Sequence, residues 1–303
     1  MKALITGAHG FLGRHFAQCL GNSGFAVHGF GHGAWDPGEA SRFGISFWHP
    51  FDVTVEALAT YGGEPNIIVH CAGSASVGFS VLHPFEDYVR TVSSTVAVLE
   101  YIRLHSRSTV MVYPSSTAVY GTVDSLPIQE STPPRPASPY GVHKLMAEDA
   151  CRSYASGYGI SVALIRFFSI YGEGLRKQLL WDACTKAEND EAMFFGTGGE
   201  LRDWLHVEDA ALLVREAIGR ASASVPVVNG GSGIGLPVRD IVGAVFREYG
   251  SSVEPTFSGI ARPGDPPGYQ ADVTQAHSWG WSPRIDWRQG VRRYVQWFRS
   301  ERR

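Results

Sequence analysis

The chain has 303 residues, 44% of them hydrophobic and 18% charged, which is typical of a folded globular protein and excludes disorder as its main state. Its 26 lysine and arginine residues against 29 aspartate and glutamate residues leave a formal charge of −3, so bulk charge does not favour binding to nucleic acid or to an anionic membrane. No apolar run approaches the roughly 20 residues that cross a bilayer, and the N-terminus lacks the pattern of a signal peptide. Four scattered cysteines without CxxC spacing are typical of reduced thiols, so we expect a cytoplasmic protein without a metal site.

Short apolar runs alternate with longer segments of helical periodicity, which is the pattern of parallel strands joined by crossover helices. Strands are expected at residues 2–6, 26–30, 67–71, 110–113 and 162–166, and helices at residues 13–23, 85–105 and 140–157. This order predicts an α/β fold with a doubly wound parallel sheet. After Gly172, clustered glycines, prolines and tryptophans predict a smaller, loop-rich C-terminal lobe. We therefore expect two lobes, residues 1–170 and 171–303, that share a cleft.

Three glycines, Gly7, Gly10 and Gly13, lie three residues apart between the first strand and the first helix. Glycines at these positions permit a tight turn and let the backbone approach a pyrophosphate at the helix N-terminus. An ordinary turn can carry such glycines, but the strand before and the helix after them favour a site for NAD or NADP. The second strand ends without a carboxylate that would bind the adenine ribose. Because Arg14 and His32 could instead face a 2′-phosphate, the sequence slightly favours NADP over NAD.

Hydroxyl and amine groups follow in two further segments. The apolar strand that begins at Val110 ends in hydroxyl side chains that include Ser116, at the edge where parallel sheets build their sites. Tyr140 and Lys144 are four residues apart in a predicted helix and therefore share one helical face. An ammonium group beside a tyrosine favours the phenolate, so Tyr140 can exchange a proton with a sugar hydroxyl while Ser116 bonds the same oxygen. A core tyrosine covered by a lysine is the alternative for the isolated pair.

These motifs together resemble the extended short-chain dehydrogenase/reductase family, specifically its NAD(P)-dependent nucleotide-sugar epimerases, dehydratases and 4-keto reductases. The resemblance runs through nearly the whole chain, in the segments TGAHGFLG (6–13), DV (52–53), HCAG (70–73), SSTAVYG (115–121), YGVHK (140–144), RFFSIYG (166–172), LRDWLHVED (201–209) and RPGD (262–265). It implies a Rossmann domain over residues 1–170 and a lobe over residues 171–303 that mainly binds a nucleoside diphosphate sugar, with residues 203–233 returning to the first domain. It also implies a homodimer through a four-helix bundle built from residues 85–105 and 140–157.

The resemblance assigns the catalytic roles to Ser116, Tyr140 and Lys144. The implied cofactor site comprises Gly7, Gly10, Phe11, Leu12, Gly13, Arg14, His32, Asp52, Val53, Ala72, Tyr140 and Lys144. The implied substrate site comprises Ser76, Ser116, Ser169, Lys177, Arg202, Arg262 and Asp265. Thr91 and Ser169 stand where the family often has asparagine, so the substrate contacts there are expected to differ or to use water.

Three functions remain open at the level of sequence. Related dehydratases place two acidic residues directly after the catalytic hydroxyl, whereas this chain has Thr117 and Ala118 there, which disfavours dehydration. We expect a nucleotide-sugar 4-epimerase that acts through a transient 4-keto sugar, with an NADPH-dependent reductase of nucleotide 4-keto-6-deoxy sugars as the alternative. A non-catalytic sensor of a dinucleotide is a third interpretation, which the intact Ser116, Tyr140 and Lys144 oppose.

Overall fold

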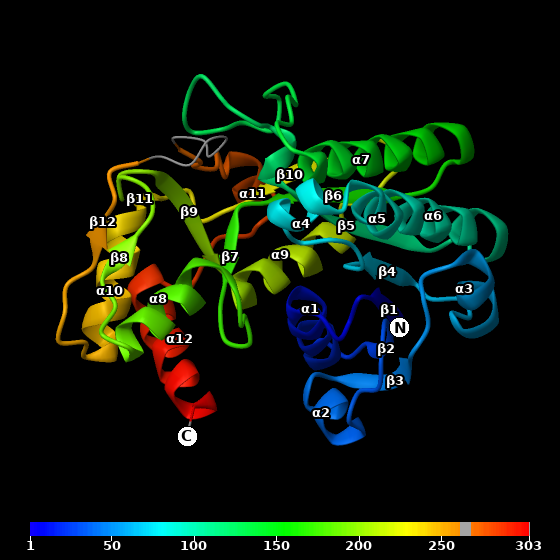
Figure 1. Ribbon diagram of the computed structural model, residues 1–303. Coiled ribbons are helices and arrows are strands. Elements are labelled where there is room, and N and C mark those ends of the chain that lie inside the picture. The colour runs from blue at the N-terminus through cyan, green and yellow to red at the C-terminus, as the bar shows by residue number, and fades with distance from the viewer. Residues whose placement is uncertain (261–267, 303) are drawn as a thin grey trace.

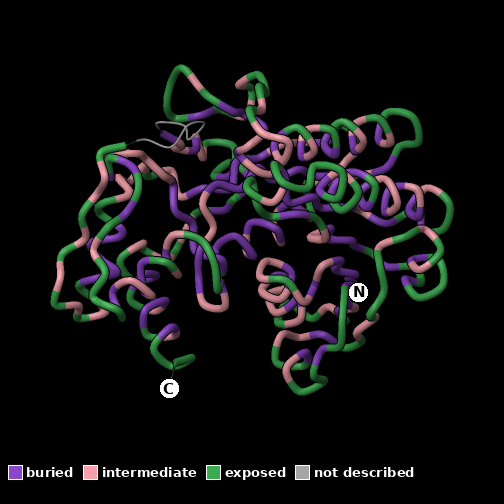
Figure 2. The backbone as a smooth tube through the Cα atoms, in the orientation of Figure 1, coloured by how far each residue is buried: buried purple, intermediate pink, exposed green. Residues whose placement is uncertain are grey.

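Seven parallel strands form the central sheet of the computed structural model, which describes residues 1–260 and 268–302 (Figure 1). The strand order is β10-β6-β5-β4-β1-β2-β3. The strands are β1 (Lys2–Thr6), β2 (Ala26–Phe30), β3 (Ile45–His49), β4 (Ile67–His70), β5 (Val110–Ser116), β6 (Val162–Phe167) and β10 (Val227–Gly230). β4 and β6 are buried along their whole length, because helices cover both faces of the sheet (Figure 2). The predicted α/β class with a doubly wound parallel sheet is confirmed.

Helices form one layer on each face of this sheet. Against one face pack α1 (Phe11–Asn22), α9 (Val207–Ile218) and the short α11 (Thr274–Ser278). Against the other pack α3 (Val55–Tyr61), α6 (Ser94–His105) and α7 (Pro139–Tyr158). The short α2 (Pro37–Arg42) follows β2 and contacts β3. Each layer encloses its own apolar core. The strand ends are therefore held in place by packing on both faces of the sheet.

A second group of elements surrounds a third apolar core. It contains α8 (Gln178–Glu188), α10 (Val238–Tyr249) and α12 (Trp287–Glu301). A three-stranded sheet of β7 (Ser169–Tyr171), β9 (Leu201–His206) and β11 (Gly235–Pro237), and a ribbon of β8 (Met193–Phe194) and β12 (Thr256–Phe257), complete it. Between these elements the chain crosses back, since α9 and β10 pack with the central sheet. None of the helices in the described part of the chain has the length and apolarity of a membrane span.

The predicted helix over residues 85–105 is wrong as a single regular element. The segment contains α5 (Pro84–Tyr88), a π-helical turn η1 (Val89–Ser93) and then α6, and a further helix α4 (Val77–Leu82) precedes them. The hydroxyl of Ser94 donates to the carbonyl of Arg90 at 2.6 Å, and that of Thr95 donates to the carbonyl of Thr91 at 2.6 Å. Hydroxyls that bond the preceding turn accommodate such a widening, and π turns are frequent at functional sites.

Candidate active site

The carboxyl ends of four neighbouring strands carry most of the residues singled out from the sequence. Gly7 follows β1, Ala72 follows β4, Ser116 ends β5 and Ser169 follows β6, and these strands are adjacent in the sheet. The strand order reverses between β1 and β4, and doubly wound sheets bind their ligands in the crevice at such a reversal.

The glycine-rich turn packs directly against the loop after β4. Gly7 has a φ of +66°, and a Cβ there would lie 2.7 Å from the Ala72 nitrogen, so a side chain is excluded. The Gly10 nitrogen donates to the Gly7 carbonyl at 2.9 Å and closes the turn. Gly10 is the N-cap of α1, and no side chain of the described residues caps that helix end. The N–H groups of the first residues of α1, which are Phe11, Leu12 and Gly13, therefore remain free to face an anion.

Both cations that the sequence offered for a 2′-phosphate already face carboxylates. Arg14 lies 3.3 Å from Glu39 of α2, donates to the His9 carbonyl at 2.8 Å and rests against aromatic rings. The His32 ring lies 2.9 Å from Asp52, and both side chains are exposed. These pairs remove the reason for the slight preference for NADP. Val53, next to Asp52, packs against the core under α3.

Ser116 and Tyr140 meet because two short segments are pressed together. Ser116 ends β5 and its hydroxyl accepts from the Ala118 nitrogen at 3.2 Å, which starts the 3₁₀ turn η2 (Thr117–Val119). Ser138 caps α7 by accepting from the Gly141 nitrogen at 3.2 Å. A Cβ at Gly141 would lie 2.4 Å from the Ala118 carbonyl, so only glycine lets α7 approach η2 this closely. The approach brings the Tyr140 phenol close enough to Ser116 for the serine hydroxyl to lower the pKa of the phenol.

The ionisable groups of this trio are tuned by burial. Burial raises the pKa of Tyr140, while the hydrogen bond with Ser116 lowers it and the nearby Asp87 carboxylate raises it. Burial lowers the pKa of Lys144 to about 8, so its ammonium still carries most of its charge at neutral pH. The ammonium donates to the Pro114 carbonyl at 2.9 Å and lies 4.8 Å from the centre of the Tyr113 ring. The Lys144 ammonium thus lies against the Tyr113 ring near the end of β5, on the same helix that carries Tyr140.

A cavity of about 230 Å³ lies within the second group of elements, lined by residues from β7 to α10. Ser169 and Arg202, which the sequence assigned to substrate, both line it, together with Gln178, Leu179, Asp182, Lys186, Phe194, Phe195, Gly196, Glu200, Trp204 and Val238. The predicted Lys177 does not line this cavity but is the N-cap residue of α8. Ser76 caps α4 by accepting from the Phe79 nitrogen at 3.2 Å and also lies outside the cavity. Arg262 and Asp265 fall outside the described residues.

Gln178 is a cavity residue that the sequence analysis missed. It has a φ of +68°, a left-handed conformation that is costly for a residue with a side chain. Such strain persists only where the surroundings demand it, and it often marks a functional position. The sequence analysis singled out Lys177 as a substrate contact. The side chain that faces the cavity belongs to the next residue, Gln178.

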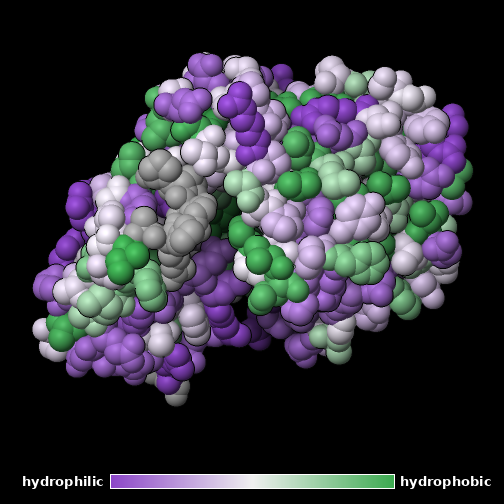
Figure 3. Space-filling model, turned by 45° about the horizontal axis from the view of Figure 1, so that its top comes forward, coloured by the Kyte–Doolittle hydropathy of each residue, from purple (hydrophilic) through white to green (hydrophobic). Residues whose placement is uncertain are grey.

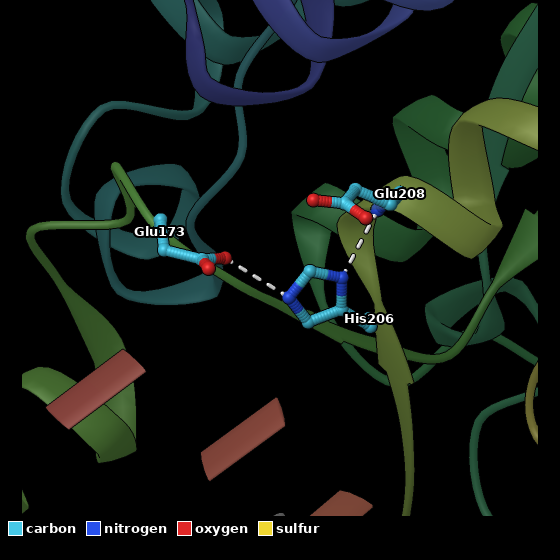
Figure 4. Close-up of side chains that lie close together, drawn as sticks. All are labelled: Glu173, His206 and Glu208. Carbon is cyan, nitrogen blue, oxygen red and sulfur yellow. Dashed lines mark hydrogen bonds and ion pairs between the residues drawn. The ribbon is translucent and has the colours of Figure 1, made fainter. Parts of the chain in front are cut away.

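Glu173, His206 and Glu208 form a group of potential metal ligands within 4.8 Å of one another (Figure 4). Their atoms already have partners: His206 bonds Glu173 at 3.0 Å through Nε2 and accepts from the Glu208 nitrogen at 3.3 Å through Nδ1. The Arg293 guanidinium of α12 donates to Glu173 at 2.8 Å and also pairs with Glu208. Burial alone would raise the pKa of Glu173, but His206 and Arg293 lower it to about 2. The cluster thus joins the loop after β7 to α12. The positive charge that pairs with its two carboxylates is the Arg293 guanidinium.

The chain is similar to known proteins along most of its length. The NAD dependent epimerase/dehydratase family matches residues 3–230. The UDP-glucose 4-epimerase of Azospirillum brasilense is 28% identical over 324 residues, covering 99% of this chain and 92% of that protein. UDP-glucuronate 4-epimerase 4 of Arabidopsis thaliana is 27% identical over 330 residues, covering 99% and 76%. A solved structure of UDP-glucuronic acid 4-epimerase from Bacillus cereus, in complex with UDP-glucuronic acid and NAD, superposes with a TM-score of 0.87 at 25% identity and covers 99% of this chain and all of that one. Since the family match spans well over half of its length, the chain is an enzyme of the NAD-dependent epimerase/dehydratase family.

Proposed function

We propose that this enzyme interconverts the C4 epimers of a UDP-linked hexose, with a nicotinamide dinucleotide as its hydride carrier. The observation that carries the proposal is the group formed by Ser116, Tyr140 and Lys144. This group lies at the carboxyl ends of the parallel strands, between the glycine turn and the cavity of Ser169 and Arg202. The relatives that act on UDP-glucose and UDP-glucuronate support the same reaction with different sugars.

A dinucleotide fits the residues at the glycine turn. The free N–H groups of α1 suit a pyrophosphate, and the space that a Cβ at Gly7 would fill is closed by the Ala72 backbone. The proposed contacts are Gly7, Gly10, Phe11, Leu12, Gly13, Arg14, His32, Asp52, Val53, Ala72, Tyr140 and Lys144. When bound, the dinucleotide supplies a reversible hydride acceptor for C4 of the sugar.

Tyr140 is the proposed proton carrier. Its phenolate, stabilised by the Lys144 ammonium, takes the proton of the sugar 4-hydroxyl as the C4 carbonyl forms, and the Ser116 hydroxyl bonds the same oxygen. The phenol later returns the proton to that oxygen, which restores the starting enzyme. Thr117 and Ala118 offer no carboxyl group beside Ser116, so elimination of water is not supported.

The nucleotide part of the substrate is proposed to lie in the 230 Å³ cavity. A guanidinium such as that of Arg202 suits a diphosphate, because its planar donors match phosphate oxygens in pairs. Ser169 and Gln178 supply polar contacts on the neighbouring walls. Ser76, Lys177, Arg262 and Asp265 remain proposed substrate contacts.

The direct test is incubation of the purified enzyme with UDP-glucose, UDP-glucuronic acid or UDP-N-acetylglucosamine, followed by proton NMR of the products. We expect at least one substrate to reach the same epimer ratio from either side without net consumption of a reductant. If no sugar is interconverted and NADPH is instead consumed with a nucleotide 4-keto-6-deoxy sugar, the reductase alternative is correct.

Glu39 is expected to make the enzyme prefer NAD, because its carboxylate holds Arg14 and would repel a 2′-phosphate. Replacing Glu39 by Gln should free the guanidinium and strengthen NADPH binding relative to NADH about tenfold, which corresponds to about 1.4 kcal/mol. Dissociation constants from cofactor fluorescence measure this ratio. The matched control is Glu191→Gln, which removes an exposed carboxylate near β8 and should leave the ratio unchanged. An unchanged ratio in the Glu39 variant would contradict the assignment.

We also propose a homodimer built on α6 and α7. Figure 3 shows patches of hydrophobic surface on the face that it draws. The segments from α4 to α7 carry exposed apolar side chains, namely Val77, Val81, Leu82, Phe85, Val89, Leu104, Val142 and Met146. Val142 and Met146 are one turn apart on α7. Replacing Val142 by Asp should convert a dimer to a monomer in sedimentation velocity, whereas Met193→Asp on β8 should not. A wild-type protein that sediments as a single protomer would reject the dimer.

A further inference from the structure

A second cavity, of about 350 Å³, lies outside the proposed active site. It is formed by one side of α10, the segment around β12 and the first turn of α12. These helices pack around the third apolar core and stand apart from the central sheet (Figure 1). The lining shares no residue with the cavity of Ser169 and Arg202. The proposed reaction therefore gives this second cavity no role.

Three exposed arginines line the second cavity. Arg239 and Arg247 lie two turns apart on one face of α10, and Arg288 lies in the first turn of α12. No ion pair joins their guanidinium groups to a carboxylate of residues 1–260 and 268–302. Arg292 of α12, by contrast, pairs with Glu248 at 3.3 Å. Three unpaired cations around one space repel one another, and a bound anion relieves that repulsion.

Two of these guanidinium groups have a defined place at the cavity. Arg288 lies over the Trp287 ring, 4.3 Å from its centre, which limits the freedom of its side chain. Gly243 lies between Arg239 and Arg247 on the same face of α10, and a Cβ there would lie 3.2 Å from Arg247 Nη1. Glycine inside a helix costs about 1 kcal/mol relative to alanine. Here it leaves room for the Arg247 guanidinium to lie against the helix at the cavity.

The remaining walls are acidic and apolar. Asp240 of α10 and Glu254, shortly before β12, contribute carboxylates, and Pro255, Phe257 and Trp287 contribute apolar surface. Carboxylates repel a bare anion, but they accept hydrogen bonds from hydroxyl groups. Guanidinium groups match phosphate oxygens with paired donors. The combination suits a ligand that carries both a phosphate and hydroxyl groups on a compact ring.

We propose that this cavity binds a phosphorylated sugar, either free or as part of a nucleotide, at a site separate from the active site. The three arginines hold the phosphate, and Asp240 and Glu254 accept hydrogen bonds from the sugar hydroxyls. The volume of about 350 Å³ lies within the range of small-molecule sites. This inference goes beyond the proposed function and does not depend on it.

Fluorine NMR of the protein labelled with 5-fluorotryptophan follows both cavities in one titration, because Trp287 lines this cavity and Trp204 lines the other. The spectra of Trp287→Phe and Trp204→Phe identify the two signals. Ribose 5-phosphate and UMP, titrated separately at constant ionic strength, should each shift the Trp287 signal at lower concentrations than inorganic phosphate does. Both results support the site, and the tighter ligand shows whether the free or the nucleotide-borne sugar phosphate is preferred.

Replacing Arg247 by Gln should weaken ribose 5-phosphate binding at Trp287 by about tenfold and leave the Trp204 response unchanged. The matched control is Arg299→Gln, which removes the same charge from α12 at a guanidinium that lies over the Tyr249 ring, outside the cavity. A Trp287 signal that does not move, or that responds equally in Arg247→Gln, would overturn the proposal. So would inorganic phosphate that binds as tightly as ribose 5-phosphate. Since the readout needs no turnover, absence of epimerisation would count against the proposed function alone.

Discussion

Replacing Tyr140 by Phe is expected to lower the rate of 4-epimerisation by about 10²–10⁴-fold, the usual contribution of a positioned general acid or base. The ring stays, so the packing of α7 against η2 is retained, but no group remains to take the proton of the sugar 4-hydroxyl. The Ser116 hydroxyl cannot replace it, because its oxygen is far less acidic than a phenol. Steady-state rates with the UDP-sugar identified by NMR measure the loss.

A second tyrosine of the same helix provides the control. Tyr154 of α7 donates to Glu100 at 3.1 Å and lies about four turns after Tyr140 and about three turns after Lys144, so Tyr154→Phe should keep nearly full activity. Cofactor binding should survive in Tyr140→Phe, which separates a lost proton carrier from a lost fold. Turnover close to the wild type in Tyr140→Phe would contradict the mechanism, and a protein that only senses a dinucleotide would be indifferent to the change.

The parts of the site that sequence predicts well lie within single elements. Gly7 and Gly10 are set by the turn between one strand and one helix, and Tyr140 and Lys144 share a face because they are four residues apart. Ser116 is recognisable because it ends an apolar strand. In such cases the spacing of residues along the chain determines how their side chains lie relative to one another. The order of strands and helices is enough to predict the doubly wound sheet.

The parts that sequence does not predict depend on contacts between distant elements. Glu39 meets Arg14 from 25 residues away, and Asp87 meets His143 from 56 residues away. Neither pair has a spacing that marks it in advance. The left-handed Gln178 also has no signature, because its conformation is imposed by the junction between β7 and α8. Likewise, the π turn η1 depends on where two hydroxyls bond, and apolar periodicity does not report that.

Replacing Glu148 by Gln is expected to lower the free energy of unfolding by about 3–5 kcal/mol. Glu148 of α7 is fully buried and forms two hydrogen bonds with Arg166 of β6, at 3.0 and 2.8 Å. Ser115, next to the catalytic Ser116, donates to the same carboxylate at 2.6 Å. The substitution leaves the buried Arg166 cation without its counter-charge. Asp149→Asn is the control, because its exposed pair with Arg152 should contribute less than about 1 kcal/mol in urea unfolding at pH 7.

The dependence of this loss on pH follows from the ionisation of Glu148. Burial alone would raise its pKa, but the bonds and charge of Arg166 lower it below the ordinary value. The contribution of Glu148 to stability is therefore complete above the pKa that the residue has in the unfolded chain. It disappears as the pH falls through the lower pKa of the folded state, so the difference in free energy of unfolding between wild type and Glu148→Gln should narrow at acidic pH.

The double variant Glu148→Met with Arg166→Leu should recover part of the stability, because no unpaired charge is then buried. A gap at pH 7 that stays below about 1 kcal/mol would show that α7 is anchored to the sheet by apolar packing alone.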